Sequence, residues 1–227
     1  MRTGLVALGM AAGAVLVLAA AGEAQAALPR LPNADGKARV AAVRGLAAEA
    51  GLSDAWGDFF ALVAWRESKG NPSAVNDSIS EAEAAATAFG RNQHRYAGCG
   101  HSDGDYTFGS GGWFGILPAN GLAQLDEAFM CLPPASVFEP RVAMAMAVGF
   151  ARGLMGWDGY QRVPTWLNLR AMWGKPGKGG DPERLAAVRD KFTQDAAEVG
   201  LPASWLDQRP PPLSTAGAEV LERLQAV

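Results

Sequence analysis

Apolar residues recur at helical spacing along most of the chain, and this pattern predicts a mainly α-helical protein. Residues 37–50 carry an apolar side chain every three or four positions, and Gly51 ends the segment. A second helix is expected from Ser53 or Asp54 to about Ser68, where the sequence Lys-Gly-Asn-Pro interrupts it. Because no window alternates polar and apolar residues with a period of two, we expect long loops and little or no β-sheet.

A strongly apolar helix is predicted in the second half of the chain. Residues 139–155 are apolar on nearly every side, so we expect this segment to be the central, buried helix. The stretch 98–112 is rich in glycine, serine and aspartate, which predicts a long ordered loop. The other expected helices span residues 80–89, 118–129, 163–173, 181–199 and 215–226.

Glu67 occupies a position where the helical pattern calls for an apolar side chain. At about 3.6 residues per turn, it shares one face of its helix with Trp56, Phe60 and Val63. An ionised carboxylate that is buried without a partner is costly, so the chain must pair it, neutralise it or use it. One hypothesis is a structural carboxylate paired with an arginine, and the other is a catalytic carboxylate.

The first 26 residues have the pattern of a bacterial-type export signal. Arg2 precedes an apolar run over 5–21, and Ala-Gln-Ala at 24–26 fits a cleavage site. We therefore predict an exported protein, periplasmic or secreted. An uncleaved membrane anchor is the alternative, although an apolar run of about 17 residues is marginal for a membrane span.

The rest of the chain is expected to form one domain with a short extension at each end. Residues 27–36 read as a linker, 37–200 as the domain, and 201–227 as a proline-rich tail with a short C-terminal helix. The formal net charge is −3 and there is no basic stripe, which argues against a nucleic-acid partner.

The chain has two cysteines, Cys99 and Cys131, and an oxidising compartment favours a disulfide between them. A zinc site that adds His94 and His101 is an alternative, but the spacing matches no common zinc pattern. Free thiols are the third possibility. We expect no metal and no cofactor.

Three short stretches carry the candidate chemistry, and together they resemble a known family. They read ESKGNPSAVN from Glu67, GWFGILPA from Gly112 and AMWGKPG from Ala171. These stretches are similar to the E-S…N-P-x-A, G-L-M-Q-x-x-P-A and A-Y-N-A-G-P-G motifs of soluble lytic transglycosylases and goose-type lysozymes. The resemblance covers roughly residues 40–180. The chain departs from the family at three positions, where the family has glutamine, tyrosine and asparagine: Gly115, Met172 and Trp173.

The resemblance implies a lysozyme-like helical domain and a peptidoglycan lytic transglycosylase. Such an enzyme cleaves the β-1,4 bond between N-acetylmuramic acid and N-acetylglucosamine. By resemblance, Glu67 acts first as general acid and then as general base, and it yields a 1,6-anhydromuramyl product. An apolar wall around a carboxyl favours its protonated form, which a general acid needs.

The motif positions also supply candidate substrate-binding residues. By resemblance, Ser68 orients the carboxyl or the substrate's N-acetyl group, and the aromatic side chains of the second and third stretches are candidates for stacking on sugar rings. The substrate-binding candidates are Ser68, Asn76, Trp113, Phe114, Gly115, Met172 and Trp173. Gln93 or His94 could replace the missing motif glutamine.

Two other functions remain open at this stage. A water-using muramidase would need a second carboxylate about 6.5–9.5 Å from the first, and the loop 77–111 offers Asp77, Asp103 and Asp105. Each of these is also an ordinary turn aspartate. A non-catalytic glycan-binding or scaffold protein with the same fold is the other alternative. The expected partners are peptidoglycan glycan strands, with a cell-envelope protein on the tail as a further hypothesis, and the expected state is a monomer.

Overall fold

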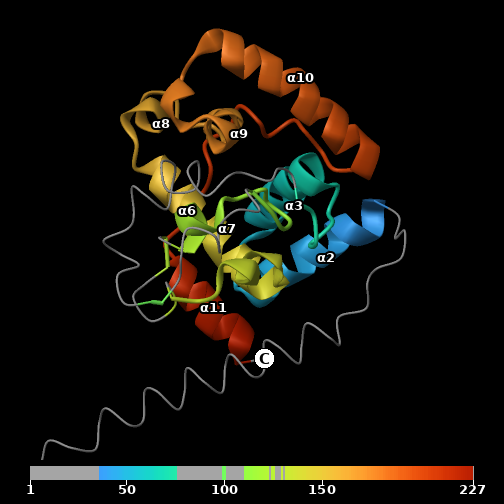
Figure 1. Ribbon diagram of the computed structural model, residues 1–227. Helices are drawn as coiled ribbons and strands as arrows, with labels where there is room; N and C mark the ends of the chain where they lie inside the picture. The colour runs from blue at the N-terminus through green and yellow to red at the C-terminus, as the bar shows by residue number, and fades with distance from the viewer. Residues whose placement is uncertain are drawn as a thin grey trace, which may run out of the picture. The chain divides into compact units, whose positions relative to one another are not determined.

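The computed structural model describes residues 36–75, 99–100, 110–122, 124–125, 129 and 131–226 (Figure 1). The chain divides into two units at residue 34, and every described residue lies in the second unit, Asp35–Val227. The described residues form eight α-helices, two 3₁₀ helices and no β-strand, which confirms the predicted mainly α fold class. Isolated bridges join Gly111 to Val75 and to Ile116.

The helices follow the predicted order, with two main differences in their bounds and one helix, residues 158–162, that was not predicted. The predicted helix 118–129 is shorter and ends at Leu122, because residues 124 and 125 lie in a turn. The predicted helix 163–173 begins later, at Trp166, because Thr165 is extended and its side chain accepts a hydrogen bond from the Asn168 N–H. The elements are α2 (Gly36–Glu49), α3 (Asp54–Ser68), α6 (Pro118–Leu122), η2 (Pro134–Phe138), α7 (Pro140–Met155), α8 (Asp158–Arg162), α9 (Trp166–Gly174), η3 (Pro176–Lys178), α10 (Pro182–Val199) and α11 (Gly217–Gln225).

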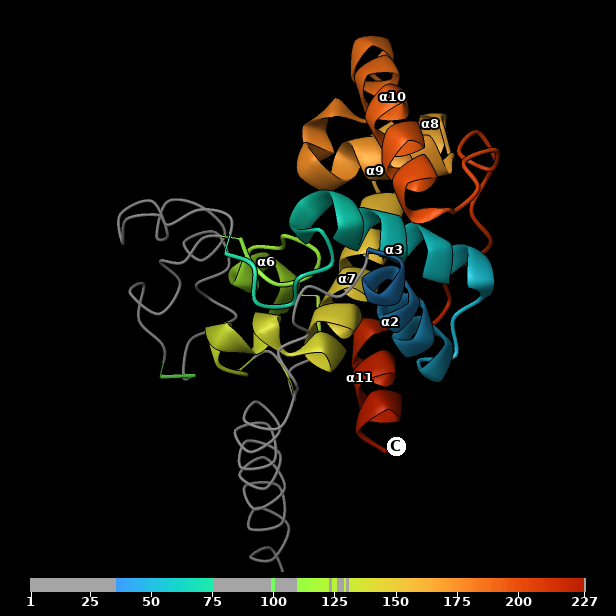
Figure 2. The ribbon, with the colours of Figure 1, turned by 90° about the vertical axis from the view of Figure 1, so that its right-hand side faces the viewer.

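The helix α7 is buried along most of its length, as its sequence predicts. It contacts α6, η2, α9 and α11, and Figure 2 shows it between α3, α6 and α11. Its start is well defined because Pro140 occupies the first turn and the Glu139 carboxylate accepts a hydrogen bond of 2.8 Å from the Val142 N–H. The core therefore forms around α7.

The helices α2 and α3 pack on each other and contribute another large part of the hydrophobic core. Trp56, Phe59 and Phe60 on α3 are buried, and their rings contact that of Trp166 or one another. The helix α3 ends where Lys69 adopts a left-handed conformation with φ of 53°. This end fixes the last turn of α3, which carries the candidate catalytic carboxylate.

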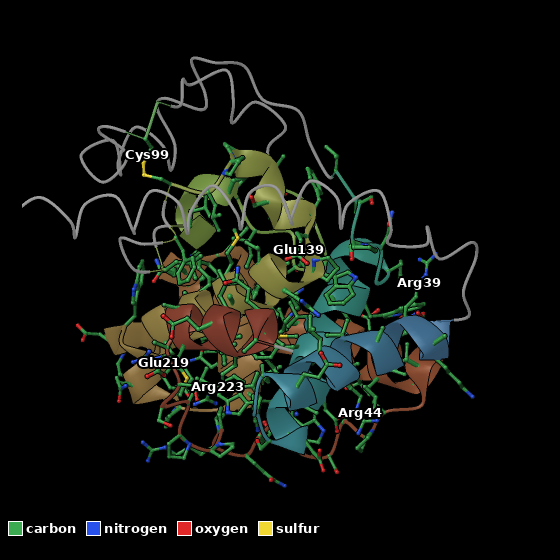
Figure 3. All side chains as sticks on the ribbon, turned by 90° about the horizontal axis from the view of Figure 1, so that it is seen from below. Arg39, Arg44, Cys99, Glu139, Glu219 and Arg223 are labelled. Carbon is green, nitrogen blue, oxygen red and sulfur yellow. A yellow bond between two sulfur atoms is a disulfide. The ribbon has the colours of Figure 1, made fainter. Side chains whose placement is uncertain are left out.

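The segment 201–226, predicted as part of a proline-rich tail with a short C-terminal helix, packs into the same core. Leu206, Leu213 and Leu221 are buried in the common hydrophobic core. The helix α11 packs along α7 (Figure 1), and Arg223 donates a hydrogen bond of 3.2 Å to the Ala50 carbonyl (Figure 3). The reason is that α11 is amphipathic, with its apolar residues on one face.

A disulfide joins Cys99 to Cys131, as predicted (Figure 3). The zinc and free-thiol alternatives fall away, because both thiols are consumed in this bond. In the part of the chain that the structure describes, no helix is long and apolar enough to cross a membrane. Four predicted segments lie outside the described residues, wholly or for the most part: the export signal, the linker 27–36 except for residue 36, the helix 80–89 and most of the loop 98–112.

Candidate functional site

An open cavity of about 1000 Å³ lies beside the end of α3, and Glu67 lines it. The turn 115–117 forms another part of the wall, and the segment 173–177 at the end of α9 a third part. The structure therefore brings residues from all three sequence stretches together around one cavity. The last turns of α7 complete the wall.

Glu67 is paired with a buried arginine. Nη2 of Arg170, on α9, donates to Oε1 of Glu67 at 2.6 Å. The side chain of Arg170 is 8% exposed, whereas that of Glu67 is 24% exposed. Glu67 therefore has one side against a cation in the protein interior and another side that faces the cavity.

The surroundings of Arg170 explain why this pair forms. Burial lowers the pKa of Arg170, Glu67 acts in the opposite direction, and the neighbouring cations Arg184 and Arg66 lower the pKa further. Asp195 provides a second, weaker opposing contribution. A guanidinium keeps its charge even so, and the Glu67 carboxylate compensates much of that buried charge.

Hydrogen bonds to the main chain hold the second stretch against the end of α3. Oγ of Ser68 lies 2.9 Å from the carbonyl oxygens of Ala64 and Trp113, and it can donate to either. Nε1 of Trp113 donates to the Gly70 carbonyl at 3.1 Å. In this structure the Ser68 hydroxyl thus connects two main-chain segments, and its role in orienting the carboxyl or the substrate stays a prediction.

The turn itself requires glycine. Gly112 has φ of 68°, and a Cβ on it would lie 2.2 Å from the Val137 carbonyl oxygen. Gly115, which replaces the motif glutamine, has φ of 57° and lines the cavity. A glutamine would be strained in this backbone conformation, whereas glycine adopts it without strain.

The third stretch is bonded to the second. Nε1 of Trp173 donates to the Phe114 carbonyl at 3.1 Å, and Trp173 lines the cavity. Trp113, Phe114 and Met172 are buried at 5%, 1% and 0% exposure, and none of them lines the cavity. These three candidates for substrate binding are therefore core residues that support the wall.

The remaining predicted site residues cannot be placed. Asn76 and the candidate second carboxylates, Asp77, Asp103 and Asp105, lie outside the described residues, as do Gln93 and His94. Of the described residues that line the cavity, Glu67 is the only one with an ionisable side chain.

Several cavity residues were not anticipated from the sequence. The side chain of Trp157 is half exposed and lines the cavity together with Phe150. Residues 150, 153 and 154 follow helical spacing on the last turns of α7, and this stripe was the available signal. Trp157 lies beyond α7, as the extended residue before α8 (Asp158–Arg162). Asn120 and Gln124 add amide groups, and no sequence pattern indicated either one.

No protein-family model, curated protein or solved structure matches this chain. The chemistry of the cavity and the three sequence stretches around it are therefore the observations that bear on function.

Proposed function

We propose that this protein is an exported peptidoglycan lytic transglycosylase with Glu67 as its general acid and base. The observation that carries the proposal is the position of Glu67, the sole ionisable side chain among the described cavity-lining residues, next to parts of the second and third stretches. The disulfide between Cys99 and Cys131 is compatible with an oxidising compartment outside the cytoplasm.

One carboxyl group is sufficient for this reaction. Glu67 donates its proton to the glycosidic oxygen as the bond from that oxygen to C1 of the muramic acid breaks. The C6 hydroxyl oxygen of the same sugar then bonds to C1, and its proton passes to Glu67. No water is consumed, so the second carboxylate of a hydrolase is not needed.

The pair with Arg170 is compatible with this role. Arg170 contacts Oε1 of Glu67, and the Glu67 side chain also lines the cavity, where it can reach a bound glycan. The first proton transfer leaves an ionised carboxylate, and the adjacent guanidinium stabilises that product.

The rest of the described wall suits a carbohydrate. Sugar rings offer apolar faces and many hydroxyl groups, and binding sites for such ligands combine apolar or aromatic surface with a few polar side chains. Trp157, Phe150 and Trp173 supply aromatic surface, and Asn120 and Gln124 supply donors and acceptors.

A non-catalytic glycan-binding protein is the second candidate. The ion pair between Glu67 and Arg170 favours it, because the same pair is a common way to hold a structural carboxylate. The departures from the family motif at Gly115, Met172 and Trp173 point in the same direction.

The test is the release of muropeptides from purified peptidoglycan by the wild type, Glu67→Gln and Glu222→Gln. Glu222 is an exposed glutamate on α11 that does not line the cavity, so its variant reproduces the change in charge alone. We expect wild type and Glu222→Gln to release 1,6-anhydromuropeptides, and Glu67→Gln to lose at least about 100-fold in rate.

The other outcomes separate the alternatives. Products with hydrolysed reducing ends would identify a water-using muramidase. Binding to peptidoglycan without release of any product would identify a glycan-binding or scaffold protein. Equal release by wild type and Glu67→Gln would remove Glu67 from the mechanism.

A further inference from the structure

Arg170 also lines a second cavity, which shares no lining residue with the first. It has a volume of about 110 Å³ and lies among α3, α9 and α10, which are neighbours in Figure 1. Its lining residues are Arg66, Arg170, Arg184, Val188, Lys191 and Phe192. The ion pair of Glu67 with Arg170 therefore connects the walls of the two cavities.

The lining of this second cavity is strongly cationic. It contains four basic side chains and, among the described residues, no acidic one. Arg66 has an ion-pair contact with Asp195 at 3.4 Å, and Arg170 has one with Glu67. Burial lowers the pKa of Arg170, and the nearby charges of Arg184 and Arg66 lower it further.

Two arginines that line this cavity each have a buried N–H group with no acceptor among the described residues. Nε of Arg170 and Nε of Arg184 are both buried, and neither has a hydrogen-bond partner in the described structure. Arg170 as a whole is 7% exposed. Most buried donors in proteins are hydrogen-bonded, so two unbonded Nε–H groups on arginines that line one small cavity indicate a missing acceptor.

We propose that this cavity binds a phosphate- or sulfate-like tetrahedral oxyanion, either free or as the phosphoryl group of a larger molecule. Guanidinium groups bind such oxyanions through charge-assisted hydrogen bonds, often two at a time. Val188 and Phe192 supply apolar surface that lowers the local dielectric and strengthens these interactions. The site is separate from the proposed glycan cavity and does not depend on the proposed activity.

The shared arginine couples the two cavities. An oxyanion in the second cavity and the ionised Glu67 both draw on the positive charge of Arg170. Coupling of this kind is reciprocal, so a change in the charge of Glu67 must alter the affinity for the anion. Glu67→Gln should raise the anion affinity roughly tenfold, the size expected for like charges within about 10 Å near a protein surface.

The binding is tested by calorimetric titration of the full chain with inorganic phosphate, at an ionic strength held constant with chloride. We expect saturable binding at one site, with a dissociation constant of about 1 mM or lower. Arg184→Gln and Lys191→Gln should each weaken it at least about tenfold. Arg189→Gln is the matched control, because Arg189 lies on α10 but does not line the cavity.

Further measurements identify the ligand and control for misfolding of the variants. Glycerol 3-phosphate that binds as well as inorganic phosphate would indicate a phosphoryl group on a larger molecule, and binding of inorganic phosphate alone would indicate the free ion. Lys191 is exposed, so Lys191→Gln should melt at the wild-type temperature without phosphate and keep the test valid if Arg184→Gln unfolds. Phosphate binding no better than chloride, or equal weakening by Arg189→Gln, would overturn the proposal.

Discussion

At the scale of single residues, the environment of Glu67 combines the two hypotheses that the sequence left open. The carboxylate is paired with Arg170, as a structural carboxylate would be, and it also lines the large cavity, as a catalytic one would. The sequence predicted the core-facing position of Glu67 from helical spacing. It could not predict the partner, because Arg170 is 103 positions away and meets Glu67 only after α9 packs beside α3.

A double-mutant cycle measures how much of this pair is structural. Glu67→Gln leaves Arg170 beside Arg184 and Arg66 with less compensating charge, so we expect a loss of about 1–3 kcal/mol in the free energy of unfolding. Arg170→Met alone should also destabilise the fold. The double variant should be less destabilised than the sum of the two by about 1–3 kcal/mol, as measured by urea denaturation.

The same variants separate stability from activity. The double variant should recover part of the stability without recovering muropeptide release, because the proton donor is still missing. Additive effects on stability would show that the contact at 2.6 Å contributes nothing to folding.

Asp58 and Asp207 are expected to contribute to stability with opposite dependences on pH. Burial raises the pKa of Asp58 above its ordinary value of 3.8, although the Arg44 charge opposes this effect. The folded state therefore binds this proton more tightly than the unfolded state, and the contribution of Asp58 to stability is lost as the pH rises through its folded pKa. As the pH rises from about 3.5 to about 7, a range that brackets this titration, the free energy of unfolding of Asp58→Asn should increase relative to that of wild type.

Asp207 provides the control with the reverse sign. The hydrogen bonds from Arg189 lower the pKa of Asp207, so its contribution is present above pH 3.8 and is lost as the pH falls through the folded value. Relative to wild type, Asp207→Asn should become less stable over the same rise in pH. The test is chemical denaturation of both variants and wild type at several pH values. If the free energy of unfolding of both variants changed with pH in the same direction relative to wild type, this account would be contradicted.

At the scale of the helices, the sequence predicted the ends best where it contains a clear cap or breaker. Glu139 with Pro140 and Asp181 with Pro182 mark the starts of α7 and α10. A turn at residues 124 and 125 follows the early end of α6. The late start of α9 is set by the N-cap Thr165, a signal that the sequence contains but that the prediction did not use.

The position of α11 also depends on long-range packing. Its periodicity predicted an amphipathic helix, yet the preceding prolines suggested a separate tail. The structure shows α11 buried against α7 instead. Amphipathicity implies that a helix has a partner surface, but it does not identify that surface.

This packing predicts a large loss of stability when the core face of α11 is truncated. Leu221 is fully buried, so Leu221→Ala should lower the free energy of unfolding by about 2–5 kcal/mol. Glu222→Ala, on the exposed face of the same helix, should change it by less than about 0.5 kcal/mol. If α11 were instead a detachable tail, Leu221→Ala would behave like Glu222→Ala in chemical denaturation.

At the scale of the whole molecule, the sequence predicted the helical class and the disulfide. It did not separate residues that line the cavity from residues that support it. Trp173 and Gly115 line it, whereas Phe114 and Met172 are core residues at neighbouring motif positions. This distinction depends on where each side chain points after packing, and a motif in one sequence carries no such information.

The central claim is that Glu67 cleaves peptidoglycan by internal attack of the C6 hydroxyl. The most direct test is mass analysis of the muropeptides released in water enriched in ¹⁸O. The account predicts anhydro ends without ¹⁸O from the wild type and loss of these products with Glu67→Gln, while the folded state is verified by its melting curve. Incorporation of ¹⁸O at the new reducing ends, or undiminished release by Glu67→Gln, would contradict it.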